Sequence, residues 1–368
     1  MLNENILKNE ERAVFALRAL YKNYGYSPFK MSKFEEYDLY VRNKDFLVGD
    51  SVITFNDTDG KLLAMKPDVT LSIIKNTVDE DNVKRKVFYN ENVYRVSPKT
   101  HRFKEIMQTG IECIGDIDIT DVYEVVFLAA KSLSLISPDF VLDISHLGIH
   151  SSILDEITDN KLLKRELAKL ISEKNIHEAV ELCQKHCIAK EKQELITSII
   201  NTYGAPDVVL ESLMGICNGK GMAAFDELRE LCRLLSKTEF SDKIRIDFSV
   251  VNDMRYYDGI VFKGFLNGIS EDVLSGGEYA PLMRRIGRKS NAIGFALYTD
   301  ILEELNKRSK EFDVDVLLIY DRKTKAECVI KEKEKYVSVG KSVLAVKAIP
   351  HGIRYREKVN LSEVNVND

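Results

Sequence analysis

The pattern of apolar and polar positions first predicts a helix. Between residues 4 and 24 the apolar side chains, from Ile6 to Leu20, recur near helical spacing, and Gly25 follows them. An apolar stripe with a period near 3.6 residues is typical of an amphipathic helix, and glycine is common just after a helix end. We therefore expect one opening helix that ends near Gly25.

From about residue 45 to 145 the apolar runs shorten to the length of strands. Four segments carry this pattern: DSVITFND, KLLAMKPDVT, KRKVFYNENVYRV and KEIMQTGIECIG. An Asp-Gly pair at 59–60 separates the first two and predicts a tight turn. The polar loop SPKTHRF separates the last two and predicts an antiparallel hairpin.

Residues 148–240 change to a helical period, in runs such as KLLKRELAKLISEK and MAAFDELRELCRLLSK. We expect a helical insertion from about 150 to 240. Strand patterns resume at KIRIDFSVV and YYDGIVFKGF, and Ser-Gly-Gly at 275–277 is interpreted as a turn. AIGFALYTDILEEL follows, and its second half is expected to be helical. The sequence thus predicts an α+β fold whose antiparallel sheet is interrupted by helices and completed after them.

The end of the chain predicts a separate small α/β unit. It contains the strand-like segments DVLLIY and SVLAVKA with a Lys- and Glu-rich helix candidate, TKAECVIKEKEKY, between them. We therefore expect a core over residues 1–312 and a small C-terminal domain over residues 313–368.

Composition and charge limit the classes of partner. The 53 basic residues are interspersed among 58 acidic ones, for a formal charge of -5. Affinity for nucleic acid comes mainly from neutralising phosphates, so this balance does not favour tRNA binding. No stretch approaches the roughly 20 apolar residues of a membrane span, and no apolar leader opens the sequence. We expect a cytosolic protein with no membrane partner.

The six cysteines are scattered through predicted strands and helices, which favours reduced thiols that fill the core. Cys183, His186 and Cys187 could be read as metal ligands, but no second ligand pair lies nearby. Thiols at positions i and i+4 are equally explained by one helix face. We predict neither a metal site nor a cofactor.

The strand after the polar loop carries the first candidate chemistry. A period of two places Gln108, Gly110 and Glu112 on one face. An amide and a carboxylate separated by a glycine suit the ammonium group of a small amino acid, which needs acceptors and open space. The same alternation is also typical of a strand with one solvated face, so this pattern alone leaves both interpretations open.

Other polar side chains lie beside glycines or loops. Arg95 ends the preceding strand, and Asp68 and Thr70 form a second acceptor pair at i and i+2. Tyr256 and Tyr257 are expected to open a strand, and the glycine that follows at 259 permits close approach of another group. The segment Gly-Gly-Glu-Tyr, which ends at residue 279, adds a further aromatic side chain.

In their order along the chain, these segments resemble the class II aminoacyl-tRNA synthetase core, in particular its histidine branch. MKPDVT resembles the Arg-Pro-Glu-(Gly)-Thr segment, VYRVSPKTHRFKEIMQTGIECIG resembles motif 2, and MRYYDGIVF resembles the histidine-specific Tyr-Tyr segment. SGGEYAPL corresponds to Gly-Gly-Arg-Tyr-Asp and AIGFALYTDIL to motif 3. The resemblance covers roughly residues 5–310. It implies a histidine site made of Asp68, Thr70, Arg95, Gln108, Glu112, Tyr256, Tyr257 and Tyr279.

Departures from the family pattern bear on catalysis. The motif 3 arginine position holds Ile301, preceded by Asp300, and the histidine-specific arginine position holds Asn252. Arg255 is close, but its odd offset along a strand points it to the opposite face. Adenylate formation needs positioned cations around the α-phosphate. The resemblance therefore implies a histidine pocket without ATP activation.

The short tail is about half the length of the anticodon-binding domain of that family. A histidine pocket without adenylation resembles the regulatory subunit family of short-form ATP phosphoribosyltransferase, which acts in histidine biosynthesis. That resemblance implies no activity of its own, a separate catalytic subunit as partner, a self-dimer and a hetero-octamer. Two alternatives stay open: an active histidine-tRNA ligase that uses Arg255 or Arg284 instead, and an amino-acid-binding module for another partner.

Overall fold

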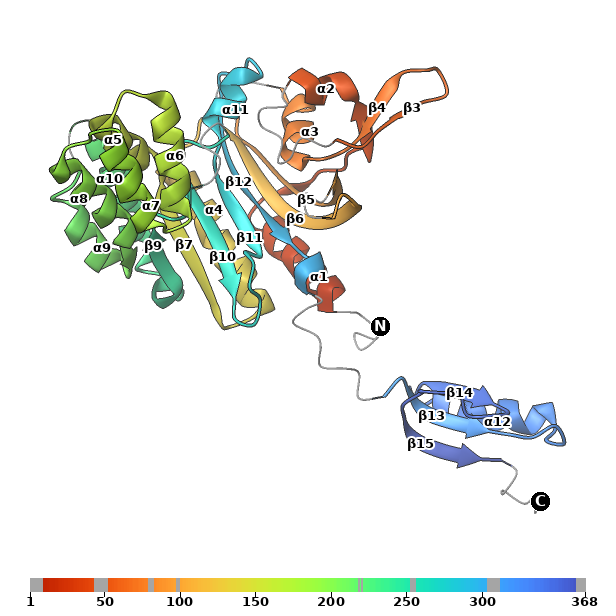
Figure 1. Ribbon diagram of the computed structural model, residues 1–368. Coiled ribbons are helices and arrows are strands. Elements are labelled where there is room, and N and C mark those ends of the chain that lie inside the picture. Colours follow the sequence, from red (N-terminus) through yellow and green to blue (C-terminus); the bar gives the residue numbers. More distant parts are fainter. Residues whose placement is uncertain are drawn as a thin grey trace. The chain divides into compact units, whose positions relative to one another are not determined.

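The computed structural model describes residues 9–42, 52–78, 83–96, 100–217, 219, 221–251, 256–302 and 312–361. Their contacts divide the chain into two compact units, residues 1–304 and 305–368. The larger unit is built on a nine-stranded sheet in the order β1-β5-β6-β12-β11-β10-β7-β9-β8 (Figure 1). Its strands are β1 (Ser27–Pro28), β5 (Arg85–Val96), β6 (Phe103–Gly115), β7 (Phe140–His146), β8 (Tyr203–Gly204), β9 (Ile244–Asp247), β10 (Ile260–Leu266), β11 (Leu274–Glu278) and β12 (Asn291–Tyr298).

The central strands from β5 to β7 each run antiparallel to their neighbours, which confirms the predicted class of sheet. β5 and β6 form the predicted hairpin across the polar loop, of which residues 97–99 lie outside the described residues. Parallel pairs occur at the two ends of the sheet, where β1 joins β5 and β9 joins β7. The sheet is therefore interrupted in sequence after β7 and continued at β9, with only the two-residue β8 contributed from the segment between them.

Two helices, α1 (Asn9–Asn23) and α4 (Ile119–Ile136), pack on one face of this sheet. The ring of Tyr21 in α1 lies 6.2 Å from Phe88 and 6.1 Å from Phe295. α1 ends as expected, because Gly25 takes a φ of +84° and the next amide donates back to the Tyr21 carbonyl. Residues that alternate with Phe88 and Phe295 along their strands therefore face away from α1.

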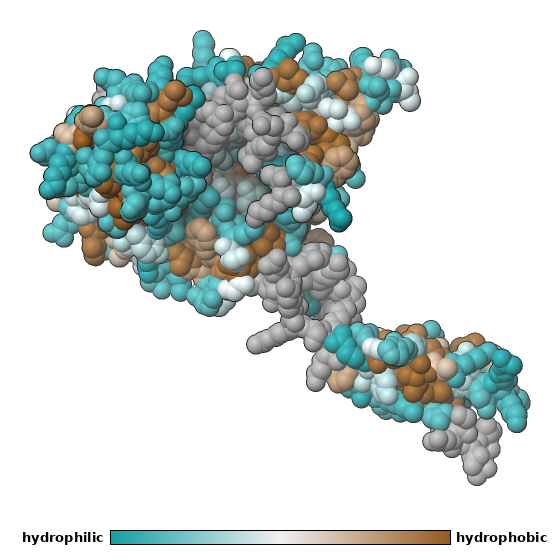
Figure 2. Space-filling model, in the orientation of Figure 1, coloured by the Kyte–Doolittle hydropathy of each residue, from teal (hydrophilic) through white to brown (hydrophobic). Residues whose placement is uncertain are grey.

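The predicted helical insertion is confirmed (Figure 1). Each of its helices buries an apolar stripe, so their outer surface is mostly hydrophilic (Figure 2). The helices are α5 (Leu147–Ile157), α6 (Lys161–Ser172), α7 (Ile176–Lys185), α8 (Lys190–Asn201), α9 (Pro206–Leu213) and α10 (Gly221–Leu235). One turn of 3-10 helix, η3 (Ser241–Lys243), leads from them into β9.

A second, smaller sheet in the same unit has the order β2-β4-β3. The predicted Asp-Gly turn joins β3 (Thr54–Asn56) to β4 (Leu62–Met65), and Gly60 has a φ of +80°. β2 (Phe34–Glu36) leads into α2 (Tyr37–Arg42). The prediction that a strand extends through residue 70 is wrong. α3 (Val69–Lys75) begins there, because the Asp68 side chain caps it by accepting from the Leu71 amide at 2.9 Å.

Two further predictions in this unit are wrong. Ser-Gly-Gly at 275–277 is not a turn but the middle of β11, where a Cβ on Gly276 would lie 2.5 Å from the Gly294 carbonyl oxygen. These glycines allow strands to approach closely. Tyr256 and Tyr257 precede β10 instead of opening it.

The last part of the larger unit contains one short helix and, after β12, one helical turn. α11 (Ala280–Arg285) lies between β11 and β12. The helix expected after β12 is a single 3-10 turn at 300–302, and residues 303–311 lie outside the described residues.

The C-terminal unit is the small α/β structure that the sequence predicted. β13 (Val314–Ile319) pairs in parallel with β14 (Val343–Val346) and with β15 (Tyr355–Asn360), and α12 (Ala326–Val337) connects the first two. The third strand was not predicted, because YREKVN carries too few apolar residues to show an alternation.

The cysteine cluster differs from the single helix face that we expected. Cys183 is buried in α7, whereas Cys187 is exposed and lies beyond the helix end with a φ of +55°. In the described ranges, no three His, Cys, Asp or Glu side chains are grouped so as to hold a metal ion. None of the described helices is both long and apolar enough to cross a membrane.

Candidate functional site

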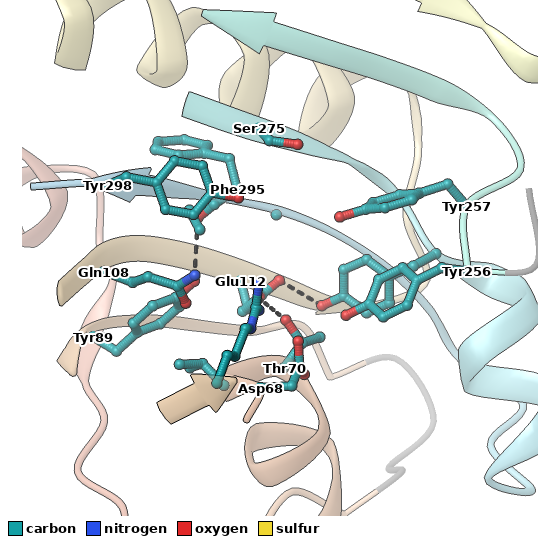
Figure 3. A pocket seen from close by; sticks show the side chains of 15 residues that line it. Asp68, Thr70, Tyr89, Gln108, Glu112, Tyr256, Tyr257, Ser275, Phe295 and Tyr298 are labelled. Carbon is teal, nitrogen blue, oxygen red and sulfur yellow. Dashed lines mark hydrogen bonds between the residues drawn. The ribbon is translucent and has the colours of Figure 1, made fainter. Parts of the chain in front are cut away.

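A cavity of about 210 Å³ opens on the face of the main sheet that α1 and α4 leave uncovered. Its lining comes from β5, β6, β11 and β12, from the start of α3 and from the segment before β10 (Figure 3). All eight residues of the predicted site lie around it, namely Asp68, Thr70, Arg95, Gln108, Glu112, Tyr256, Tyr257 and Tyr279. The volume is below the about 300–1,000 Å³ of pockets for drug-sized ligands, so it suits a molecule the size of an amino acid.

The face of β6 that carries the amide and the carboxylate is not solvated. Gln108 is 4% exposed and Glu112 is 2% exposed, and both line the cavity. The choice left open by the sequence is thereby decided against a wet strand face. Gly110, between them, has no room for a side chain, because a Cβ would lie 2.5 Å from the Tyr89 hydroxyl oxygen.

Glu112 accepts two side-chain hydrogen bonds within the cavity. Its Oε1 accepts a hydrogen bond from the Thr70 hydroxyl at 2.8 Å, and its Oε2 accepts one from the Tyr279 hydroxyl at 2.6 Å. Burial raises the pKa of Glu112 to about 8, and the two hydroxyl donors oppose that rise. Thr70 therefore acts as a donor here, and not as the acceptor that we predicted.

Asp68 and Arg95 place an acidic and a basic side chain at the same cavity. Burial raises the pKa of Asp68, while its bond from the Leu71 amide and the nearby Arg95 oppose the rise. The Arg95 Nε donates to the Pro67 carbonyl oxygen at 2.9 Å, which fixes the guanidinium beside the turn into α3. Among the described residues that line the cavity, Arg95 is the single cation.

Tyrosines form much of the remaining wall. The rings of Tyr256 and Tyr257 lie 4.6 Å apart, and Tyr256 lies 5.8 Å from Tyr279. Burial raises the pKa of each of these phenols, so all three stay protonated near neutral pH and serve as donors or acceptors. Figure 3 shows Tyr256 and Tyr257 approaching the cavity from the side opposite Gln108.

The sequence prediction missed three polar side chains of the lining: Tyr89, Ser275 and Tyr298. Sheet register brings them in, since Tyr89 pairs with Gly110 and Tyr298 pairs with Gln108. Alternation along the motif 3 strand places residues 294, 296 and 298 on one face and offered a signal for Tyr298. Ser275 was hidden because its segment was interpreted as a turn.

The positions that depart from the synthetase pattern lie apart from this lining or outside the described residues. Ile301 is half-buried and does not line the cavity, and Asp300 lies 3.9 Å from the Lys104 ammonium. Arg284, one of the alternative cations, contacts Asp258 at 3.3 Å and does not line the cavity either. Asn252 and Arg255 lie outside the described residues.

Comparison with known proteins places this cavity in a family. A sequence model of the histidyl-tRNA synthetase family matches residues 2–302. The chain belongs to the histidyl-tRNA synthetase family. Within that family, curated relatives carry the name ATP phosphoribosyltransferase regulatory subunit. The protein of Alkaliphilus metalliredigens is 28% identical over 86% of this chain and 82% of its own length, and that of Ruminiclostridium cellulolyticum is 24% identical over 85% and 77%.

Solved structures of the family share the fold. An ATP phosphoribosyltransferase regulatory subunit/histidyl-tRNA synthetase from Bacillus halodurans has a TM-score of 0.77 at 21% identity, covering 96% of this chain and 93% of that one. A chain of an ATP phosphoribosyl transferase complex from Thermotoga maritima has a TM-score of 0.63 at 20% identity, covering 81% and 97%. The resemblance and the class II synthetase-like fold predicted from the sequence are confirmed.

Proposed function

We propose that this chain is the regulatory subunit of a short-form ATP phosphoribosyltransferase, that it binds histidine, and that it catalyses no reaction itself. One observation carries the proposal: the cavity keeps a full set of groups for an amino acid but has a single cation among its described lining residues. The names of the relatives supply the partner, a catalytic phosphoribosyltransferase chain.

The polar groups match the parts of a histidine molecule. The carboxylates of Glu112 and Asp68 suit its ammonium and imidazole groups, and the Arg95 guanidinium suits its carboxylate. Buried phenols add neutral hydrogen-bonding groups without adding charge. Such a site binds a zwitterion through contacts of both signs.

The same balance of charge works against ATP. A triphosphate brings several negative charges into a cavity whose described lining holds two acidic side chains and one arginine as its single cation. Stabilising the α-phosphate during adenylation requires further positioned cations, and loss of one such donor typically lowers the rate by about a hundredfold or more. The chain therefore retains recognition of the amino acid and not its activation.

The partner is tested by reconstitution. The chain is mixed with a short-form catalytic subunit, and phosphoribosyl-ATP formation is measured with and without histidine, alongside size-exclusion chromatography for the expected dimer and hetero-octamer. We expect the chain to raise activity and histidine to lower it. If histidine binds but activity does not respond to the chain, the protein serves another partner.

Ligase activity is tested separately by histidine-dependent exchange of pyrophosphate into ATP. We expect none above background from the isolated chain, because Ile301 and Asn252 replace cationic groups. Exchange well above background would instead make the chain an active histidine-tRNA ligase.

A further inference from the structure

A second cleft, of about 400 Å³, lies on the same face of the main sheet, over β7, β9 and β10. Strand register relates it to the first cavity. Ser275, which lines the first cavity, pairs with Lys263, and Lys263 pairs in turn with Asp143. Lys263 and Asp143 both line the second cleft, so the two spaces adjoin along one row of the sheet.

Asp143 is the unusual group of this cleft. It is 7% exposed, and its Oδ1 has no hydrogen-bond partner among the described residues. The neighbouring Asp247 is different, because its Oδ1 accepts from the Ser249 amide at 2.7 Å and its Oδ2 accepts from the Lys174 ammonium at 2.8 Å. Buried carboxylates are normally hydrogen-bonded, so an unpartnered one indicates a missing donor.

The cations of the chain near this cleft do not supply that donor. The Lys263 ammonium lies 3.6 Å from Asp272 Oδ1, and Lys174 is bonded to Asp247. Arg245 pairs with Asp143 across the strands, but its Nη1 donates to the carbonyl oxygens of Asp242 and Ile244. Burial and the proximity of Asp247 raise the pKa of Asp143 to about 7, so a large fraction of it is charged at neutral pH. The charges of Lys174 and Arg245 oppose this rise, but neither side chain donates to Asp143 Oδ1, which therefore lines the cleft without a hydrogen-bond donor from the described residues.

The composition of the walls argues for an organic ligand over a bare metal ion. The described residues offer no group of three acidic, His or Cys side chains that could hold a metal. Phe265 and Val250 line the cleft and provide apolar surface, while Glu271 and Asp272 add carboxylates. Such a site contacts both the carbon skeleton and the charged head of a small amine.

We propose that this cleft binds a small organic cation, an ammonium or guanidinium compound, whose charged head donates to Asp143 and whose carbon chain lies against Phe265 and Val250. The inference does not depend on the proposed function, because it uses none of the groups assigned to histidine. Since the two spaces adjoin, a ligand here is positioned to act on the occupancy of the first cavity.

The test is a titration of the full chain at pH 8 with butylammonium chloride and with butylguanidinium chloride. Ligand-observed NMR measures binding, and butanol serves as the neutral analogue. We expect both cations to bind and butanol to bind far more weakly. Asp143→Asn should weaken cation binding by about tenfold or more, because it removes the charge that the donor meets. Equal binding by wild type and D143N, or no preference for the cations over butanol, overturns the proposal.

Matched variants locate the probe. Asp242→Asn removes the same charge from an exposed carboxylate that does not line the cleft, and Glu112→Gln removes a carboxyl group from the first cavity. Each should change affinity by less than about threefold. Loss of binding in E112Q with retention in D143N would place the probe in the first cavity and refute the assignment. Lys263→Met should increase the affinity for the cations, because it removes a positive charge that repels them. This increase can be measured even if D143N fails to fold. Unchanged or weaker binding in K263M counts against the site.

Discussion

Burial of Glu112 disfavours the ionised form of its carboxyl group, whereas the hydrogen bonds from two hydroxyl groups favour that form. The pKa of about 8 means that the carboxyl is mainly protonated in the empty cavity at pH 7. A bound ammonium group would stabilise the ionised form by direct attraction. Ligand binding and the release of a proton are therefore coupled at this residue.

The coupling predicts that histidine binding near pH 7 releases a proton from Glu112 and that affinity increases from pH 6.5 to 7.5. Isothermal calorimetry in two buffers of different ionisation enthalpy measures the protons released. Glu112→Gln cannot ionise, so its binding, though weaker, should release correspondingly fewer protons. The same proton release from E112Q would show that another group titrates.

Truncation of the acceptors tests the placement of the ligand. Glu112→Ala and Gln108→Ala should each reduce histidine affinity by about ten- to a hundredfold or more, because each leaves a buried polar partner unpaired. Calorimetry provides the measurement. Glu105→Ala is the matched control, since Glu105 lies on the same strand but is exposed and does not line the cavity. Unchanged affinity in both cavity variants would mean that histidine binds elsewhere.

At the scale of elements, the site depends on how closely β6, β12 and β11 approach one another. Gly294 pairs with Glu112 on one side and with Gly277 on the other. A Cβ added at Gly294 would overlap Glu112 Oε2. The glycines of these strands thus make room for the carboxylate that the ligand would meet.

Gly294→Ala should therefore destabilise the chain by about 1–3 kcal/mol and also weaken histidine binding, because the overlap is relieved by displacing Glu112. Gly215→Ala is the control, since a Cβ there meets no atom within 4 Å. Urea unfolding and calorimetry on both variants provide the comparison. Wild-type affinity in G294A would show that Glu112 is not displaced.

The sheet also buries three carboxyls whose pKa values are raised by burial: Glu112 and Glu278 to about 8, and Asp143 to about 7. Their pKa values in the unfolded chain are near 4. The stability that comes from their protonation is complete below the unfolded pKa and is lost as pH rises through 7 to 8. The buried His150, whose pKa is lowered to about 3, is neutral in the folded chain, but in the unfolded chain its pKa is near 6.5, so it adds a small opposing gain in stability as pH rises above 6.5.

We predict that the free energy of unfolding falls by on the order of 1–3 kcal/mol between pH 6.5 and 8. Urea titrations at the two values measure it. The double substitution E112Q and E278Q removes two of the titrating groups, so it should flatten most of this dependence. A slope that persists in the double variant would assign the titration to other groups.

Local sequence predicted those elements whose pattern is complete within a few residues. The β5–β6 hairpin and its Gln108 and Glu112 face followed from alternation, because both faces of a strand are visible in one segment. Glycine was ambiguous, since the same residue permits a turn or close packing, and the contact of Gly276 with Gly294 is distant in sequence. Tyr89 was missed for a similar reason, because sheet register and not chain order brings it to the cavity.

At the scale of the whole molecule, the larger unit holds both spaces on one face of one sheet, and the C-terminal unit has its own sheet. A ligand in the first cavity affects a catalytic chain only if the assembled complex has two states that bind histidine differently. Activation needs the assembled interface, whereas inhibition needs that difference in affinity as well. The two effects are therefore separable by mutation.

We predict that Glu112→Ala leaves the complex with a short-form catalytic subunit assembled and active but raises the histidine concentration needed for inhibition by about ten- to a hundredfold or more. The variant removes the carboxylate that accepts from Thr70 and Tyr279 and leaves residues outside the cavity unchanged. The measurement is phosphoribosyl-ATP formation against histidine concentration for wild-type and variant complexes, with assembly checked by size-exclusion chromatography and Glu105→Ala as control. Inhibition of the assembled variant with the wild-type midpoint would place the inhibitory histidine on the catalytic chain or at an interface, because weaker binding in this cavity must raise the midpoint of any inhibition that acts through it.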